Sequence, residues 1–124
     1  MKPSTQLYRQ IRNCHIQNGY VCSLAFCPMP KDQKKLSVYD GDKISPDAAL
    51  IHFTENLKCH SEGIMAVIVQ ECHNEELNVE EDYETHQYHM LIDFTGKSKS
   101  ATKKTAEHLR NFAVKRGWLC RKKT

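Results

Sequence analysis

The chain has 124 residues, of which 40% are hydrophobic, 27% charged and 8% aromatic. This length suits one domain and is too short for a TIM barrel or a two-domain enzyme. The sequence starts without the apolar run of a signal peptide, and no stretch reaches the roughly 18 apolar residues of a membrane span. We therefore expect a soluble, cytoplasmic domain whose six cysteines stay mostly reduced.

The first third of the chain predicts short strands separated by turns. Residues 7–11 fit either a strand or a helical turn. We expect strands at 20–26 and 36–39, which carry several apolar and aromatic side chains. The second strand ends at residues 40–42, an Asp-Gly-Asp sequence that is typical of turns.

A helix is predicted at about 45–58. Ser45 is a good N-cap, Pro46 fits the first helical position, and Asp47 suits the positive end of the helix dipole. The apolar side chains then recur with helical spacing, which places them on one face. These residues are Leu50, Phe53 and Leu57.

The middle of the chain predicts two strands around an acidic segment. Residues 64–69 form an apolar, β-branched run, which favours a central strand. Residues 70–77 fit one or two helical turns, and the acidic segment at about 79–87 is predicted as a loop. Residues 88–94 alternate between polar and apolar side chains, as a strand does.

A second main helix is predicted at about 100–116, with an apolar stripe that includes Leu109 and Phe112. Gly117 stands where a helix C′ glycine belongs, and residues 118–120 fit a short edge strand. We therefore predict one α+β domain over residues 1–124. Its mixed or antiparallel sheet has four or five strands, and the two main helices pack with it.

Charge is divided unevenly along the chain. From Lys97 onward there are ten basic residues and one acid, whereas seven acids and no lysine or arginine occupy residues 71–84. The basic end predicts a surface for a nucleic acid or protein partner. The alternative is that the acidic loop and the basic helix face each other within the fold or in a homodimer. The candidate binding residues are Lys103, Lys104, Arg110, Lys115, Arg116 and Arg121.

Cysteine and histidine are frequent enough to raise the question of zinc. Three Cys-His dipeptides occur, but adjacent residues on a strand point to opposite faces and make poor joint ligands. Cys22 with Cys27 and His86 with His89 are weak matches to zinc-ligand spacing. We predict no metal site, and a structural zinc stays the alternative.

Three sequence motifs resemble a group of short bacterial proteins without an assigned function. They are Leu7-Tyr8-Arg9, a Val-x-Ser-x-Ala-Phe sequence at 21–26, and Leu-Ser-Val-Tyr at 36–39, with His89 opening a later strand before the C-terminal helix. The resemblance implies a bacterial or phage origin. Proteins of this kind fit a phage-defence or toxin–antitoxin setting.

A second resemblance is to ADP-ribosyltransferase-like domains, which bind NAD in a cleft between strands. Arg9 and Ser23 match the early arginine and the following serine of that pattern. The late strand opens with His89 instead of a glutamate, and Glu84 lies just upstream. The resemblance implies catalytic roles for Arg9 and Ser23, with NAD as the cofactor. His89 is the third catalytic candidate, because it begins a strand on the side opposite the apolar face, where we expect a residue that lines a cleft.

Two hypotheses of function follow. The first is a small binding or regulatory module that contacts its partner through the basic C-terminal face and uses no cofactor. The second is a nucleotide-handling enzyme or toxin effector that uses Arg9, Ser23 and His89. The enzyme requires those side chains to lie within the span of one ligand, whereas the binding module does not.

Overall fold

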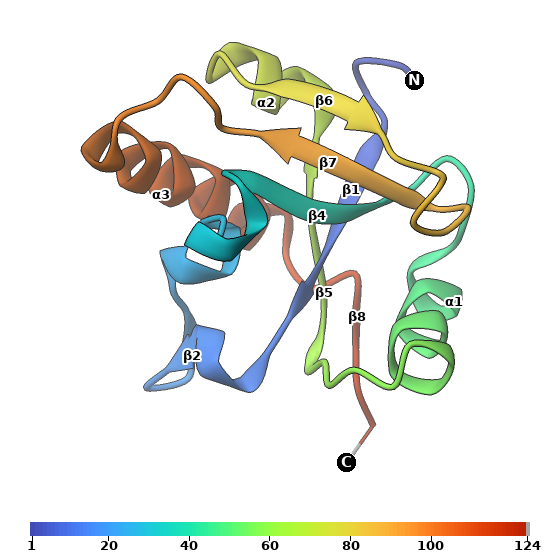
Figure 1. The fold of residues 1–124 in the computed structure, drawn as a ribbon. Helices are drawn as coiled ribbons and strands as arrows, with labels where there is room; N and C mark the ends of the chain where they lie inside the picture. Colours follow the sequence, from blue (N-terminus) through green and yellow to red (C-terminus); the bar gives the residue numbers. More distant parts are fainter. Residues whose placement is uncertain (124) are drawn as a thin grey trace.

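The computed structural model describes residues 1–123 and contains a six-stranded antiparallel sheet (Figure 1). Its strand order is β6-β7-β4-β1-β5-β8. The α+β class predicted from the sequence is confirmed, with more strands than the four or five expected. The strands are β1 (Gln6–Ile11), β4 (Lys35–Asp40), β5 (Gly63–Ile68), β6 (Asn78–Glu81), β7 (His89–Asp93) and β8 (Cys120–Arg121). A separate hairpin pairs β2 (Ile16–Gln17) with β3 (Tyr20–Val21).

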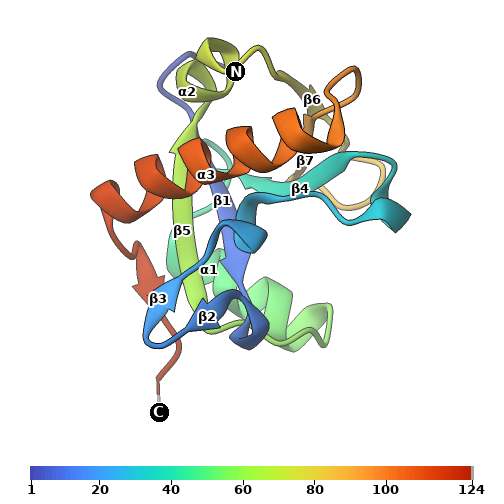
Figure 2. The same cartoon turned by 90° about the vertical axis from the view of Figure 1, so that its left-hand side faces the viewer.

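Helices cover both faces of the sheet. The longest, α3 (Lys99–Arg116), crosses one face, and α1 (Pro46–Ile51) with the π-helical turn η4 (His52–Asn56) covers the other (Figures 1 and 2). The short α2 (Val69–Asn74) follows β5 directly. None of the helices in residues 1–123 has the length and apolar character needed to cross a membrane. Three 3₁₀ turns complete the fold: η1 (Asn13–His15), η2 (Ser23–Phe26) and η3 (Pro30–Asp32).

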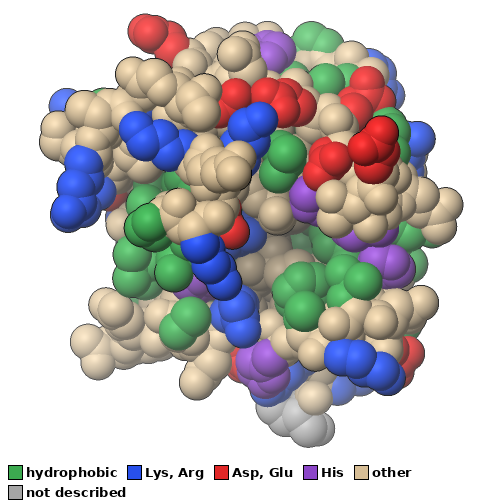
Figure 3. Space-filling view, viewed as in Figure 1, with side chains coloured by type: hydrophobic (Ala, Val, Ile, Leu, Met, Phe, Trp, Pro, Cys, Tyr) green, Lys and Arg blue, Asp and Glu red, His purple; other side chains and the backbone are tan. Residues whose placement is uncertain are grey.

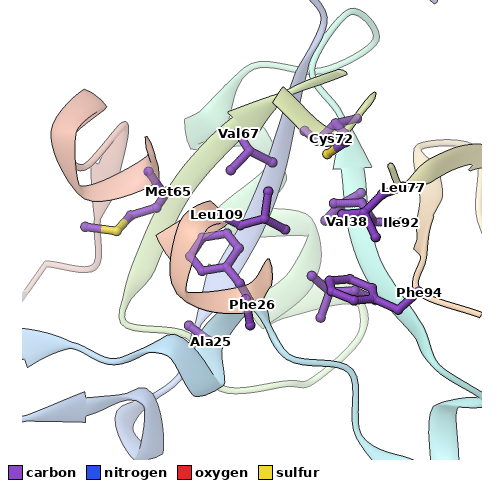
Figure 4. Packing of buried hydrophobic residues seen from close by; sticks show 14 of the residues in the cluster. Ala25, Phe26, Val38, Met65, Val67, Cys72, Leu77, Ile92, Phe94 and Leu109 are labelled. Carbon is purple, nitrogen blue, oxygen red and sulfur yellow. The ribbon is translucent and has the colours of Figure 1, made fainter. Parts of the chain in front are cut away.

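Side-chain alternation along β1 divides the core in two. Leu7 and Ile11 face α3, whereas Tyr8 faces α1, because successive side chains of a strand point to opposite faces. The larger core joins β1, β4, β5 and β7 to α3 and η2, and it contains Phe26 of η2 and Leu109 of α3 (Figure 4). The smaller core lies under α1.

Both predicted helices are present, and local signals set their ends. The Ser45 hydroxyl accepts a hydrogen bond from the Ala48 amide, and the Ser98 hydroxyl caps α3 in the same way. Gly117 ends α3 with a φ of 90°, a conformation that glycine adopts without strain. The predicted edge strand near the C-terminus is β8, which pairs with β5.

The strand predicted at 20–26 is wrong beyond Val21. A turn with positive φ at Asn18 and Gly19 pairs Tyr20 and Val21 with β2, and the chain then winds into η2. This winding buries Phe26 while Leu24 stays 57% exposed. The strand prediction was wrong because the apolar residues of this 3₁₀ turn have the composition of a strand.

Two further predictions need correction. The acidic segment at 79–87 is not all loop, because Asn78–Glu81 forms β6 and pairs with β7 while Val79 packs against the core. The apolar run at 64–69 is a strand over most of its length, but β5 lies second from the edge of the sheet. The central strands are β4 and β1. Both contain polar residues, so their sequences do not indicate a central position.

Some of the basic residues near the C-terminus pair with acidic residues within the fold. Arg116 donates to the carboxylate of Glu71 at 2.9 Å and to the Ala66 carbonyl at 2.8 Å. His108 lies 2.7 Å from Glu75. The basic helix therefore faces acids of the α2 region and not the segment 79–87. Since Arg116 is held by these contacts, it is a structural residue of the α2–α3 packing.

Leu109 of α3 is fully buried in the larger core, so we expect it to stabilise the packing of the helix on the sheet. Replacing Leu109 by alanine should lower the free energy of unfolding by about 2–5 kcal/mol, because the change leaves a cavity in the larger core. Urea denaturation followed by circular dichroism measures this. The matched control is Val114→Ala on the exposed side of the same helix, which should cost about 0.5 kcal/mol or less. Equal losses for both variants would contradict the packing described.

Candidate functional site: a cleft between two diverging strands

The main cleft of the structure lies where β1 and β4 separate. These strands pair only at Leu7 with Asp40 and at Tyr8 with Tyr39. Beyond Tyr8 the two strands diverge, and a cleft of about 380 Å³ opens between them. Figure 3 shows the hollow near the centre of the face viewed, with basic side chains on one side and histidines on the other.

Arg9 lies in the angle between the diverging strands. Its Nε donates to the Ala25 carbonyl at 2.7 Å, and Nη1 donates to the Ser37 carbonyl at 3.0 Å. Burial lowers the pKa of Arg9 to about 10, so the guanidinium is still charged at neutral pH. Two of its five N–H groups are used in these contacts, which leaves three donors for a ligand.

Cations outnumber acids on this side of the cleft. Arg12 follows the end of β1, Lys31 belongs to η3, and both are exposed and line the cleft with Arg9. Asp32 is the one carboxylate among the described residues that line it. Three positive charges against one negative charge favour an anionic ligand, and arginine binds phosphate or carboxylate with two parallel hydrogen bonds.

His89 and Asp82 form a hydrogen-bonded pair on the opposite side. His89 Nδ1 lies 2.9 Å from Asp82 Oδ2, and only 11% of the His89 side chain is exposed. The Thr85 hydroxyl, at 2.7 Å, and His89 lower the pKa of Asp82, so this carboxylate is ionised and accepts the Nδ1 proton. The basic nitrogen is then Nε2, and no hydrogen bond within residues 1–123 occupies it.

Two further histidines of the cleft are neutral. The Arg12 amide donates to Nδ1 of His15, and the Tyr88 amide donates to Nδ1 of His86. Burial lowers the pKa of each ring to about 4, with nearby Arg9 and Arg12 acting on His15, and His89 and His52 acting on His86. Each ring therefore carries its proton on Nε2 near pH 7 and is a neutral donor.

An aromatic cluster supports these histidines from the α1 side. Tyr39 lies opposite His89 in the β4–β7 pair, and its hydroxyl lies 2.7 Å from Nδ1 of His52. The centre of the His86 ring lies 4.9 Å from that of Tyr39, 4.8 Å from that of His52 and 5.1 Å from that of His89. Burial raises the pKa of Tyr39, so its hydroxyl keeps its proton and shares a hydrogen bond with His52. The cluster fixes the ring of His86 beside the dyad.

Apolar side chains complete the cleft. Met29 is 54% exposed, Leu57 is 40% exposed, and Phe53 is partly buried beside it. Met29 precedes η3, whereas the other two come from η4 and the residue that follows it. Exposed apolar residues at a cationic cleft favour a ligand with both an anionic and an apolar part.

The structure brings together two of the three catalytic residues predicted from the sequence. Arg9 and His89 line the same cleft. Ser23 begins η2 and is not among the described residues that line the cleft, although Ala25 of the same turn accepts a hydrogen bond from Arg9. Glu84 does not line it either. Ser23 therefore stays a sequence prediction outside the site.

Several site residues were missed by reasoning from the sequence. Asp82 was assigned to a loop, but the β6–β7 connection places it beside His89, seven positions later. His86 was considered only as a weak zinc ligand. Arg12 and Tyr39 carry no local signal, because their role depends on where β1 and β4 diverge. The available clue was the close spacing of Asp82 and His86, in the predicted loop, to His89 in the strand that follows it.

The cysteines and histidines form no evident metal centre. Within residues 1–123, no three side chains of His, Cys, Asp or Glu lie close enough together to hold a metal ion. All six cysteines are free thiols. Cys14 and His15 do both line the cleft, where they follow one another in η1.

The predicted basic face is divided into free and engaged cations. Arg110 donates to the Val21 carbonyl, Arg116 is paired with Glu71, and Arg121 lies 4.4 Å from the centre of the Trp118 ring. The remaining predicted binding residues are exposed and make no ion pair within residues 1–123. They are Lys103, Lys104 and Lys115.

Comparisons of the chain with protein-family models, with curated proteins and with solved structures find no match. The function of the cleft is therefore inferred from its own residues.

The neutral state of His15 makes stability depend on pH. The ring is 9% exposed, and its pKa falls from 6.5 in the unfolded chain to about 4 in the fold. The unfolded chain therefore binds the proton first as pH falls. The stability present above pH 6.5 is lost progressively down to about pH 4, and this ring accounts for up to about 2 kcal/mol of the loss between pH 7 and 5.

Urea denaturation at both pH values measures this loss. His15→Asn keeps an acceptor for the Arg12 amide but does not titrate, so the variant should lose less stability between pH 7 and 5 than the wild type. A matched control is His73→Asn, which removes an exposed histidine of α2. An unchanged pH dependence in His15→Asn would show that His15 is not held in its neutral form.

Proposed function

We propose that the protein is a nucleotide-handling enzyme that binds a phosphate-bearing ligand in the β1–β4 cleft and uses His89 as its general base. The observation that carries this proposal is that His89, hydrogen-bonded to Asp82, lines the same cleft as three cationic side chains. A base with a free nitrogen and a cationic anion-binding region are the two parts that proton abstraction beside a phosphate needs.

Recognition of the ligand rests on the arginines. Arg9 is held rigidly by two carbonyls, so its remaining N–H groups have a fixed direction before the ligand arrives. Arg12 and Lys31 are exposed and add charge at the entrance. A phosphate bound between these residues replaces water with charge-assisted hydrogen bonds, each of which contributes about 1.5–3 kcal/mol.

Catalysis rests on His89. Asp82 fixes the ring with the proton on Nδ1, so Nε2 accepts a proton from a hydroxyl group or water of the bound complex. The imidazolium that forms is stabilised by the Asp82 carboxylate. His86 and His15 are neutral donors that line the cleft, and each would donate to an oxygen of the ligand.

The size of the cleft limits the ligand. A volume of about 380 Å³ accommodates a mononucleotide and is small for a complete dinucleotide such as NAD. If NAD is the cofactor, as the resemblance to ADP-ribosyltransferase-like domains implies, Arg9 and Arg12 are the residues that fit one of its phosphates. NAD would supply the ribose carbon, a hydroxyl group or water would form the new C–O bond as the C–N bond to nicotinamide breaks, and His89 would accept the proton of that hydroxyl group or water.

The enzyme proposal predicts that adenosine 5′-monophosphate binds in the cleft, measured by isothermal titration calorimetry. Replacing Arg12 and Lys31 together by glutamate should weaken binding by at least about 10-fold, since two charge-assisted contacts are lost and two repulsions gained. His89→Asn should leave AMP binding intact but lower the rate of nicotinamide release from NAD by about 10²–10⁴-fold.

The matched control is the double reversal Lys104→Glu and Lys115→Glu, which changes the net charge equally but lies on α3 outside the cleft. Absence of AMP binding to the wild type, or equal binding to the double charge reversal, would overturn the recognition by Arg12 and Lys31. Turnover that survives His89→Asn would overturn the assigned base.

A second candidate function is favoured by the exposed cations of α3. We propose that Lys103, Lys104 and Lys115, which have no acidic partner within residues 1–123, bind an anionic macromolecule, as the charge distribution predicts. Glu107 is the one acid on this helix. Both functions suit a bacterial cytoplasmic protein, in keeping with the resemblance found in the sequence.

This second function predicts salt-dependent binding of DNA. Fluorescence anisotropy with a labelled oligonucleotide should show affinity falling steeply with salt, with a logarithmic slope of about −0.7 to −0.9 per phosphate contact. Replacing Lys103, Lys104 and Lys115 by glutamate should abolish binding. The control Lys31→Glu and Arg12→Glu pair, in the cleft, should retain it. Equal binding by the α3 variant would contradict the assignment of this face.

A further inference from the structure

A small groove separates the β2–β3 hairpin from α3. Its volume is about 280 Å³. Tyr20 and Val21 line it from the hairpin, which lies below α3 in Figure 2. The helix contributes the rest of the lining, namely Arg110, Asn111, Val114 and Lys115.

The Tyr20 ring is unusually open for a tyrosine. It is 77% exposed, and Val114 across the groove is 47% exposed. Aromatic side chains of this size normally bury most of their surface in a core or an interface. The larger core already contains Val21, the next residue, so the strand alternation directs Tyr20 away from it.

The hairpin holds Tyr20 in a fixed position. Asn18 and Gly19 both have positive φ values, 53° and 81°, which is the arrangement of a tight two-residue hairpin turn. Arg110 then ties the hairpin to α3, because its Nη1 donates to the Val21 carbonyl at 3.2 Å. An exposed aromatic ring on a pre-ordered support binds a partner with little loss of conformational entropy.

Cationic side chains surround this ring. Arg110 and Lys115 line the groove itself, and Lys103 and Lys104 extend the positive charge along the exposed side of α3. A flat ring beside lysine and arginine is the arrangement that binds unpaired bases by stacking and their phosphates by charge. A stable protein interface takes about 800 Å² and roughly 20–30 residues on each partner, whereas six residues line this groove.

We infer that the groove binds single-stranded nucleic acid, with one base stacked on Tyr20 and the adjacent phosphates contacting Arg110 and Lys115. This inference rests on the second proposed function and names its partner. A duplex keeps its bases stacked on one another, so it contacts the lysines of α3 but not the Tyr20 ring.

The test compares a labelled oligothymidylate of about 12 nucleotides with a duplex of equal length, by fluorescence anisotropy at low salt. Tyr20→Ala should weaken binding of the single strand by about 10-fold or more, while Tyr20→Phe keeps the ring and the affinity. Binding of the duplex should not change in either variant. The matched control is Leu24→Ala, another exposed apolar residue of the same segment.

The outcomes separate this inference from the function on which it rests. Single-strand binding that depends on the α3 lysines but survives Tyr20→Ala overturns the stacking site and leaves the basic face in place. Absence of binding by the wild type to both oligonucleotides overturns the nucleic-acid partner. Loss of duplex and single-strand binding together in Tyr20→Ala, with a lowered melting temperature, assigns Tyr20 to the fold and also overturns the inference.

Discussion

The two hydrogen bonds from Arg9 to the carbonyls of Ala25 and Ser37 are the interaction on which the site depends. They place a charged guanidinium between β1 and β4 where an ordinary sheet would continue its ladder. Because the strands are held apart from Tyr8 onward, the centre of the sheet contains a cleft. A buried charge is costly unless it is hydrogen-bonded. The η2 turn is therefore also needed for the site, because it provides the Ala25 carbonyl that accepts a hydrogen bond from Arg9.

The opposite side of the cleft depends on the β6–β7 hairpin. The pairing of these strands brings Asp82 to His89, and Thr85 in the connection between them lowers the pKa of that carboxylate. The dyad and Arg9 come from separate strands, and β4 lies between those strands in the sheet. Tyr39 of β4 and His52 of η4 pack against the ring of His86, which lies beside His89. The site is thus assembled by sheet order, and short sequence motifs contribute little to it.

Local physics explains which parts of the fold could be predicted from the sequence. Helix ends depend on neighbouring residues, so Ser45 and Gly117 were recognised correctly. The class of the fold was also predicted correctly. Arg9, in a segment that fitted either a strand or a helical turn, and His89, on a predicted strand, were both named as candidates and line the cleft. The role of Asp82 was missed, because it follows from the pairing of β6 with β7. The 3₁₀ turn at Ser23–Phe26 was missed, because its burial follows from contacts with α3.

The central claim is that Asp82 holds His89 with a free Nε2 in a cationic cleft. Long-range ¹H–¹⁵N spectra of the histidine rings near neutral pH test it most directly. The account predicts that His89 carries its proton on Nδ1, that Asp82→Asn abolishes this preference, and that added AMP shifts the Nε2 resonance. A His89 ring protonated on Nε2, or one whose resonances ignore both Asp82→Asn and AMP, would contradict it.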